Sequence, residues 1–247
     1  MRANGMYMII GVYGYQDSGK TTLVEGLIRE LSGKGYRVAS VKHSPDTEAT
    51  DTPGKDTWRH SEAGSDPVVL QAADSTVIIK RPGQELEAIV EMIRREFCPD
   101  VLIVEGHKGG GFPKIAVGDI EPTEGTVLVN PELEDALAYI EEQAAREATY
   151  ERLPRLDCGK CGMTCADMAI EIVADRKGFD DCREMPSRSV EIFIGGQRLP
   201  VGAFVAEIAE STIRGLLSSL KGYSETGDVE IRLRAPADET RNTPTEG

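Results

Sequence analysis

The glycine-rich loop Gly14–Thr21 (GYQDSGKT) constrains the fold of this chain most strongly, because it has the spacing of a phosphate-binding P-loop. The β-prone run Met6–Val12 precedes the loop, and the helical pattern Thr21–Leu31 follows it. A phosphate chain needs several backbone N–H groups turned toward it, and glycines let the backbone approach without Cβ clashes. The free N–H groups and the positive dipole end of the next helix add to this attraction. The sequence therefore predicts a strand, a phosphate-binding loop and a helix in that order.

Individual side chains around this loop are predicted to bind a nucleoside triphosphate. Lys20 is expected to reach the β- and γ-phosphates, and the Thr21 hydroxyl is expected to bind Mg²⁺. Glu105 ends the apolar run Val101–Glu105 (VLIVE), where a Walker B carboxylate would hold Mg²⁺ directly or through a water. Lys20 and Glu105 are the predicted catalytic residues. The predicted nucleotide-binding residues are Gly14, Gln16, Asp17, Ser18, Gly19, Lys20, Thr21 and Thr22.

β-prone runs alternate with helical patterns over the first 150 residues, which predicts an α/β fold with a P-loop NTPase-type, mostly parallel sheet flanked by helices. The runs Val68–Gln71 and Thr76–Lys80 are separated by a short turn and predict an antiparallel hairpin that makes one edge of the sheet mixed. The other expected strands are Met6–Val12, Arg37–Lys42, Val101–Glu105, Ile115–Val117 and Thr126–Val129. The expected helices are Thr21–Leu31, Asp56–Ala63, Leu86–Phe97 and Glu132–Arg146.

A domain boundary is predicted near Thr149–Leu156, between a charged helical pattern and a cluster of cysteines. The expected domains are a nucleotide-binding domain (1–150), a small α+β cysteine domain (151–234) and a disordered polar tail (235–247). The elements expected after the cysteines are a strand at Val190–Ile194, a turn at Gly195-Gly196, a helix around Phe204–Leu220 and a strand at Val229–Leu233.

The charge of the chain argues against two classes of partner. With 28 basic and 42 acidic residues the formal net charge is −14, which disfavours binding to nucleic acid or to anionic lipid. The apolar runs are far shorter than the roughly 18–20 residues of a membrane span, and no signal peptide is recognised. We therefore expect a cytoplasmic protein that binds neither membranes nor nucleic acid.

Several polar residues fall in loops that follow predicted strands, where open α/β sheets bind their ligands. His43 follows the second strand, and His107 follows the strand that ends at Glu105. The four glycines and two lysines between Glu105 and Ile115 suit a mobile lid that closes over anions. The candidate partner or substrate loops contain His43, Asp51, Lys55, Asp56, Arg59, His60, His107 and Lys108.

Four of the five cysteines lie close together in the chain: Cys158-x₂-Cys161-x₃-Cys165, and Cys182 after sixteen further residues. Such thiolates suit either an iron–sulfur cluster or Zn²⁺, and thiols without metal are the third alternative. Cys98 stands alone at the end of a helical pattern and is expected to be a buried small apolar residue without a role.

Three segments in order resemble the family of molybdopterin-guanine dinucleotide biosynthesis protein B, MobB. They are the phosphate loop, the block Val41–Gly64 (VKH…DTPGKDTWRHSEAG) and the block Val104–Ile115 (VEGHKGGGFPKI), and the resemblance covers residues 6–130. It implies a GTP-binding protein with weak GTPase activity, commonly a homodimer. Such a protein assists the guanylyltransferase that attaches GMP to the molybdenum or tungsten pterin cofactor, so that enzyme and the pterin intermediates are the implied partners.

Guanine preference rests on this resemblance alone, because the chain has no Asn-Lys-x-Asp motif and Asn130 is followed by Pro131. The cysteine block resembles the [4Fe–4S] motif of corrinoid iron–sulfur and carbon monoxide dehydrogenase/acetyl-CoA synthase proteins. The implied cofactors are GTP, Mg²⁺ and a [4Fe–4S] cluster, with zinc as the alternative to the cluster. Two other functions stay open: an iron–sulfur electron carrier or scaffold gated by nucleotide, and a metallochaperone GTPase.

Overall fold

The computed structural model describes residues 8–44, 51–81, 83–185, 190–194, 197–224, 226 and 229–231. The chain forms two compact units, residues 1–185 and residues 186–247. Among the helices of these ranges, none combines the length and the hydropathy that a transmembrane span requires.

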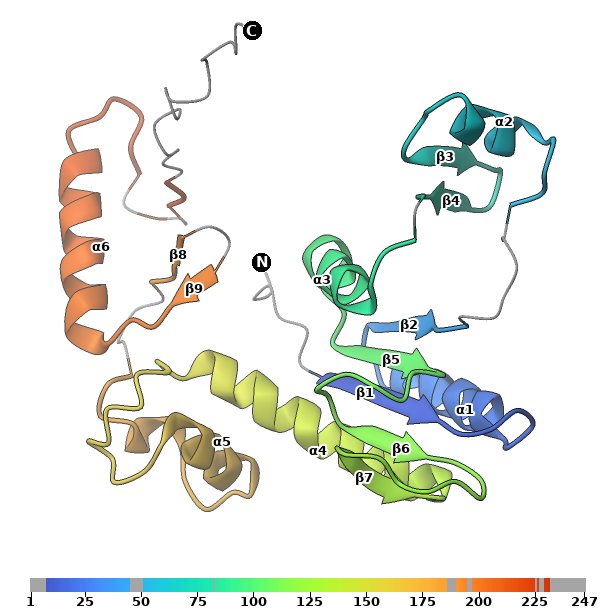
Figure 1. Ribbon diagram of the computed structural model, residues 1–247. Helices are drawn as coiled ribbons and strands as arrows, with labels where there is room; N and C mark the ends of the chain where they lie inside the picture. Colours follow the sequence, from blue (N-terminus) through green and yellow to red (C-terminus); the bar gives the residue numbers. More distant parts are fainter. Residues whose placement is uncertain are drawn as a thin grey trace, which may run out of the picture. The chain divides into compact units, whose positions relative to one another are not determined.

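A five-stranded, fully parallel sheet forms the centre of the first unit, with the strand order β2-β5-β1-β6-β7 (Figure 1). Its strands are β1 (Met8–Tyr13), β2 (Val38–Lys42), β5 (Val101–Glu105), β6 (Lys114–Ala116) and β7 (Thr126–Val129). Every residue of β5 is buried, as expected for an apolar strand with neighbours on both sides and helices on both faces. The predicted α/β fold is confirmed.

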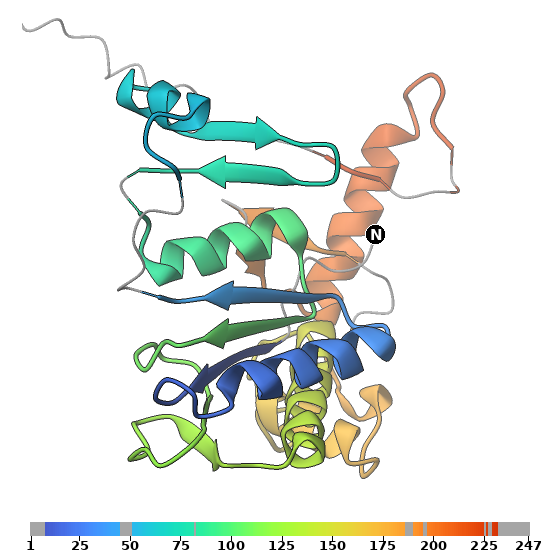
Figure 2. The ribbon, with the colours of Figure 1, turned by 90° about the vertical axis from the view of Figure 1, so that its right-hand side faces the viewer.

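Helices cover both faces of this sheet (Figures 1 and 2). Helices α1 (Lys20–Gly33) and α4 (Leu133–Arg152) pack against one face, which Val101 and Ile103 of β5 present. Helix α3 (Leu86–Phe97) packs against the other face, which Leu102 and Val104 present. The two faces alternate along β5 because successive side chains of a strand point to opposite sides.

The predicted hairpin is present, but the prediction that it makes the edge of the large sheet mixed is wrong. Strands β3 (Val68–Gln71) and β4 (Thr76–Ile79) pair only with each other and form a separate two-stranded antiparallel sheet. This sheet follows the short helix α2 (Asp56–Glu62) in the chain. The turn closes locally, with the Ala72 N–H donating to the Ser75 carbonyl at 2.8 Å. Because this local pairing uses the facing backbone groups of both strands, the hairpin forms without the large sheet.

Helix α4 is longer than predicted and runs through the expected domain boundary at residue 150. The cysteine segment that follows contains α5 (Cys165–Val173) and the 3₁₀ turn η1 (Phe179–Asp181). Helix α5 packs on the last turns of α4, where Tyr150 and Leu153 contact its apolar face. The cysteine segment therefore lies in the first compact unit, and the proposed boundaries of independently folding domains stay a prediction.

The second unit contains the antiparallel pair β8 (Ile192–Ile194) and β9 (Gln197–Leu199), followed by helix α6 (Ala203–Leu217). The predicted turn Gly195-Gly196 and the tail 235–247 lie outside the described residues. The strand expected at Val229–Leu233 is wrong for its described part, since residues 229–231 are not in a strand. A β-prone run needs a neighbouring strand for its backbone groups, and none pairs with these three residues in the described part of the unit.

Candidate functional site

The P-loop connects the carboxyl end of β1 to the first turn of α1, as predicted. A Cβ atom on Gly14 would lie 2.1 Å from the Val117 carbonyl oxygen, so this position has room only for glycine. Gly19 has φ = 89° and caps α1 without a side-chain hydrogen bond. Glycine has no side chain that could accept hydrogen bonds from the first N–H groups of α1. These groups therefore stay available to phosphates bound in the loop.

The Lys20 ammonium group folds back over the loop. Its Nζ donates to the Tyr15 carbonyl and lies 3.4 Å from Ser18 Oγ. Other predicted nucleotide-binding side chains are exposed around it, namely those of Gln16, Asp17, Thr21 and Thr22. A phosphate group bound in the loop would replace the Tyr15 carbonyl as the hydrogen-bond acceptor for Lys20. The position of this lysine permits that change of acceptor.

The two predicted Mg²⁺ ligands meet at the carboxyl edge of the sheet. Thr21 Oγ1 donates to Glu105 Oε1 at 2.9 Å, although the two residues lie 84 positions apart in the chain. Glu105 is buried at the end of β5, next to the P-loop strand β1. A hydroxyl and a carboxylate at this distance are hard oxygen ligands of the kind that Mg²⁺ takes together with phosphate oxygens and water. The residues present fit the predicted metal.

A third residue, Lys42, completes this group. Its Nζ lies 2.7 Å from the same Glu105 Oε1. Burial acts to raise the pKa of Glu105, but the hydrogen bonds from Lys42 and Thr21 and the charges of Lys42 and Lys20 hold that pKa below its ordinary value. The carboxylate is therefore kept ionised at neutral pH, the form that binds a cation.

The loop after β5 lies against both neighbouring loops. The His107 ring meets the His43 ring edge-on at 4.8 Å between centroids and lies 6.3 Å from the Phe112 ring. Lys108 Nζ lies 5.0 Å from the centre of the Tyr15 ring of the P-loop. His43, His107 and Lys108 therefore join the P-loop and Glu105 in one group at the carboxyl edge of the sheet.

The buried side chain of Lys114 anchors the same glycine-rich loop by hydrogen bonds. Its Nζ donates to the carbonyls of Gly109 and Gly110 at 3.4 Å and 3.1 Å. A cavity of about 620 Å³ lies beside these residues, lined by Lys108, Phe112, Lys114, Thr123, Glu124 and the intervening glycines. The glycine-rich loop thus has fixed contacts at its base and an exposed tip, and its role as a lid stays a prediction.

The remaining candidates of the second sequence block form a separate group around α2. Asp51 is buried and accepts a hydrogen bond from Thr57 Oγ1 at 2.8 Å, and its other oxygen lies 3.6 Å from the Arg81 guanidinium. Asp56 and Arg59 form an exposed pair at 3.9 Å. Lys55 caps α2, and His60 is exposed on it. Within the described ranges these contacts stay inside residues 51–81, so the structure does not join this group to the P-loop.

The cysteine segment gathers three of its four thiols in one small apolar cluster. Cys161, Cys165 and Cys182 pack with Leu153 and Met168, whereas Cys158 is exposed. Burial raises the pKa of the Cys182 thiol, and the charges of the other three cysteines raise it further. Across all described residues, however, no three His, Cys, Asp or Glu side chains stand close enough to hold a metal ion. The donor set fits a thiolate-bound centre by its chemistry, and the four-cysteine centre stays a prediction.

The loop before α5 is shaped by local hydrogen bonds. Asp157 accepts from the Cys165 N–H at 2.7 Å, and Thr164 and Asp167 form a capping box at the start of the helix.

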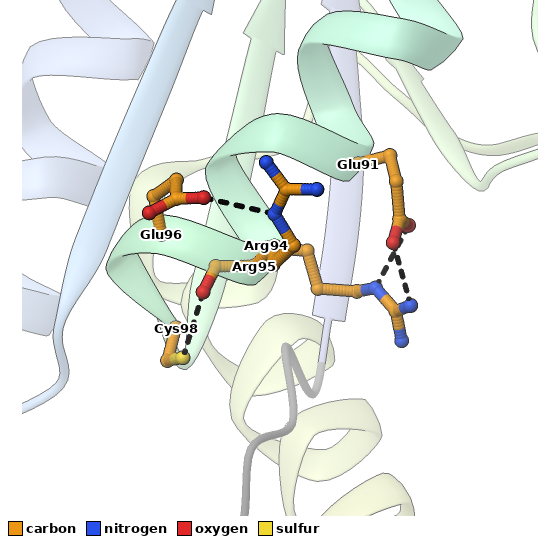
Figure 3. Close-up of polar contacts among 5 residues, drawn as sticks. All are labelled: Glu91, Arg94, Arg95, Glu96 and Cys98. Atoms are coloured by element: carbon orange, nitrogen blue, oxygen red, sulfur yellow. Dashed lines mark hydrogen bonds and ion pairs between the residues drawn. The ribbon is translucent and has the colours of Figure 1, made fainter. Parts of the chain in front are cut away.

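Cys98 lies apart from this segment at the end of α3, where its thiol donates to the Arg95 carbonyl at 3.8 Å (Figure 3). It is half-buried in a left-handed conformation at the C-cap, so the expectation of a buried apolar residue is wrong. Its place at the helix end keeps it out of the core.

The sequence did not mark Lys42 or Tyr15 as side chains of the site, and it placed Lys114 in the predicted lid and not at its buried base. Each of them lies inside a segment that the sequence singles out, since Lys42 directly precedes His43, Tyr15 lies in the P-loop and Lys114 ends the glycine-rich loop. Lys42 and Glu105 are paired residues on neighbouring parallel strands, which a single sequence does not reveal. The strand order would have identified the pair.

Comparison with known proteins agrees with this arrangement. The family "Molybdopterin guanine dinucleotide synthesis protein B" matches residues 9–141, and the family "Putative Fe-S cluster" matches residues 153–183. A Methanocaldococcus jannaschii protein named "Putative molybdopterin-guanine dinucleotide biosynthesis adapter protein" is 30% identical over 240 residues, which cover 91% of this chain and 97% of the relative. The Haemophilus influenzae adapter protein is 37% identical over 49% of this chain and 68% of its own length.

The crystal structure of Bacillus subtilis MobB is similar with a TM-score of 0.45 and 23% identity, over 56% of this chain and 98% of that protein. The match to the M. jannaschii relative extends beyond residues 9–141, over nearly the whole chain. The chain thus belongs to the MobB family of molybdopterin guanine dinucleotide synthesis proteins, and C-terminal to its MobB domain it has a segment that matches the family "Putative Fe-S cluster".

Proposed function

We propose that this protein is a GTP-binding adaptor with weak GTPase activity that assists a molybdenum cofactor guanylyltransferase in forming the molybdopterin guanine dinucleotide cofactor. The observation that carries the proposal is the meeting of Thr21 and Glu105 beside a P-loop in a chain of the MobB family. The relatives named as adapter proteins of this biosynthesis support the choice of partner. The same proposal includes a cytoplasmic location, and a tungsten pterin as the alternative to the molybdenum pterin.

The proposed mechanism assigns each group of the site one task. The N–H groups of the loop and of the first turn of α1 bind the phosphates, and Lys20 turns from the Tyr15 carbonyl to the β- and γ-phosphates. Thr21 and Glu105 would hold Mg²⁺, which neutralises phosphate charge when it is bound. His43, His107 and Lys108 line the same edge and present a polar surface to the pterin intermediate or the partner enzyme.

Equilibrium binding of a fluorescent GTP analogue tests this assignment. Lys20→Ala removes charge-assisted hydrogen bonds worth roughly 1.5–3 kcal/mol, so the affinity should fall by about 10- to 100-fold. Lys34→Ala is the matched control, because Lys34 pairs with Glu141 on the surface of α4. Competition by unlabelled GTP and ATP reports base preference. Equal affinity of wild type and Lys20→Ala would reject the P-loop assignment.

The adaptor role has its own test. Addition of the protein and GTP to a guanylyltransferase supplied with the molybdenum pterin should increase the yield of the dinucleotide cofactor, and the Lys20→Ala protein should not. An unchanged yield with wild-type protein would remove the adaptor role and leave the nucleotide site intact.

We further propose that the cysteine segment holds a [4Fe–4S] cluster through Cys158, Cys161, Cys165 and Cys182. The support is the iron–sulfur family match and the shared apolar cluster around three of the thiols. Iron and acid-labile sulfide in anaerobically purified protein should each amount to about four per chain. Cys165→Ser should abolish both, and Cys98→Ser, at the C-cap of α3, should change neither. One zinc without sulfide would replace the cluster by a structural zinc site.

One observation favours nucleotide gating of the cluster as a second function. The single helix α4 packs on the P-loop helix α1 through Leu137 and Ile140, and on α5 through Tyr150 and Leu153. In this second function GTP binding would shift the reduction potential of the cluster. Identical potentials with and without GTP, in protein that holds both, would remove it.

A further inference from the structure

Lys42 occupies a place that neither the sequence motifs nor the proposed mechanism accounts for. It is the last residue of β2, and the parallel pairing of β2 with β5 sets it directly beside Glu105. Its ammonium nitrogen lies 2.7 Å from Glu105 Oε1, the same oxygen that accepts the Thr21 hydroxyl at 2.9 Å. Two donors therefore converge on the one carboxylate oxygen next to the P-loop.

The burial of the two partners differs. The Glu105 side chain is 10% exposed, whereas the Lys42 side chain is 65% exposed. A nearly buried carboxylate without a cation is strongly disfavoured, so Glu105 needs a positive partner. The ammonium group of Lys42 supplies that partner from the solvent side. Because this ammonium group is exposed, replacing its ion pair by contacts with water costs little free energy.

Glu105 is also the carboxylate that, with Thr21, would hold Mg²⁺ in the proposed nucleotide complex. An ammonium group 2.7 Å from this carboxylate and a divalent cation held by the same carboxylate would repel each other, so binding of one would disfavour the other. The remaining charged neighbour, Lys20, is directed at the Tyr15 carbonyl and Ser18 and does not bond to Glu105 in this structure.

We propose that Lys42 is a positioning residue that holds Glu105 toward Thr21 while no nucleotide is bound, and that Lys42 leaves the carboxylate when Mg²⁺ and nucleotide bind. This inference rests on the proposed nucleotide and metal site. It means that Lys42 and Mg²⁺ compete for Glu105, so the Mg²⁺ concentration that the protein requires is set partly by this lysine.

The test is a Mg²⁺ titration of fluorescent GTP analogue binding in full-length protein, at a fixed nucleotide concentration that saturates each variant only at high Mg²⁺. In Lys42→Met the half-saturating Mg²⁺ concentration should fall by roughly three- to tenfold, the loss of one charged hydrogen bond that competes with the metal. Lys42→Arg keeps the charge and should restore the wild-type value. Lys34→Met is the matched control, since it removes a lysine from a pair with a glutamate on α4.

The outcomes separate this inference from the proposed function. A half-saturating Mg²⁺ concentration in Lys42→Met that equals or exceeds that of wild type overturns the role of Lys42 and leaves the nucleotide site standing. Wild-type protein that binds no nucleotide at any Mg²⁺ concentration overturns both. If Lys42→Met does not fold, as judged by circular dichroism, Lys42→Gln against Lys42→Arg provides the same comparison.

Discussion

At the scale of single residues, the site depends on backbone positions that exclude side chains. Gly14 lies against the Val117 carbonyl, which would be only 2.1 Å from an added Cβ, and against Ser18 Oγ at 2.6 Å. Gly33, the last residue of α1, has open space around the same position. Packing against the residue that follows β6 therefore requires glycine at position 14, independently of any bound phosphate.

This difference predicts opposite results for two Gly→Ala variants. Gly14→Ala should move the P-loop backbone, lower the affinity for a fluorescent GTP analogue by at least about tenfold and lower the melting temperature, because the clash is with a backbone oxygen. Gly33→Ala should leave affinity unchanged and stabilise the protein by up to about 1 kcal/mol, since alanine is favoured in a helix. Wild-type affinity in Gly14→Ala would contradict the described packing.

At the scale of elements, α5 depends on its N-cap. The helix has only nine residues, and its capping box joins Thr164 and Asp167, with the Thr164 oxygen accepting from the Asp167 N–H at 3.0 Å. So short a helix is not stable by itself and is held by its cap and by packing on α4.

Removal of this cap should loosen the cysteine segment. Thr164→Ala should lower the free energy of unfolding in urea by about 1 kcal/mol and speed the loss of iron from protein purified with it. Thr212→Ala, in the interior of α6, removes the same hydroxyl without a capping role and should leave both quantities nearly unchanged. Equal effects of the two substitutions would show that the capping box adds no stability.

At the scale of the whole molecule, the hairpin β3–β4 exposes an apolar pair. Val69 and Ile78 face each other across the two strands and are 56% and 62% exposed. An exposed apolar sheet face on a two-stranded ribbon suits contact with another chain. We expect this face to lie in the homodimer that the MobB resemblance implies.

Ile78→Lys should therefore shift sedimentation from dimer to monomer while the P-loop keeps its nucleotide affinity. Thr76→Lys places the same charge two residues earlier in β4, on the same face of the strand, and should weaken the dimer less, because it removes no apolar contact. A wild-type protein that sediments as a monomer would contradict the dimer itself.

The division into two compact units predicts which truncations fold. A chain of residues 1–185 should keep the melting transition and the GTP affinity of the nucleotide-binding part. A chain of residues 1–150 ends inside α4 and lacks α5, which packs on the last turns of α4, so it should unfold at a lower urea concentration. Equal stability of the two chains would favour the boundary predicted near residue 150.

Patterns within short stretches made much of this protein predictable from sequence. The strand, loop and helix around Lys20, the apolar strand that ends at Glu105 and the hairpin all follow from local periodicity and turn residues, which act over a few neighbours. The tertiary structure alone decided that the hairpin forms its own sheet, that α4 continues to Arg152, and that Lys42 meets Glu105. Each of these depends on which distant segments pair or pack, and the pairing of β2 with β5 across some sixty residues leaves no periodic signal in the chain.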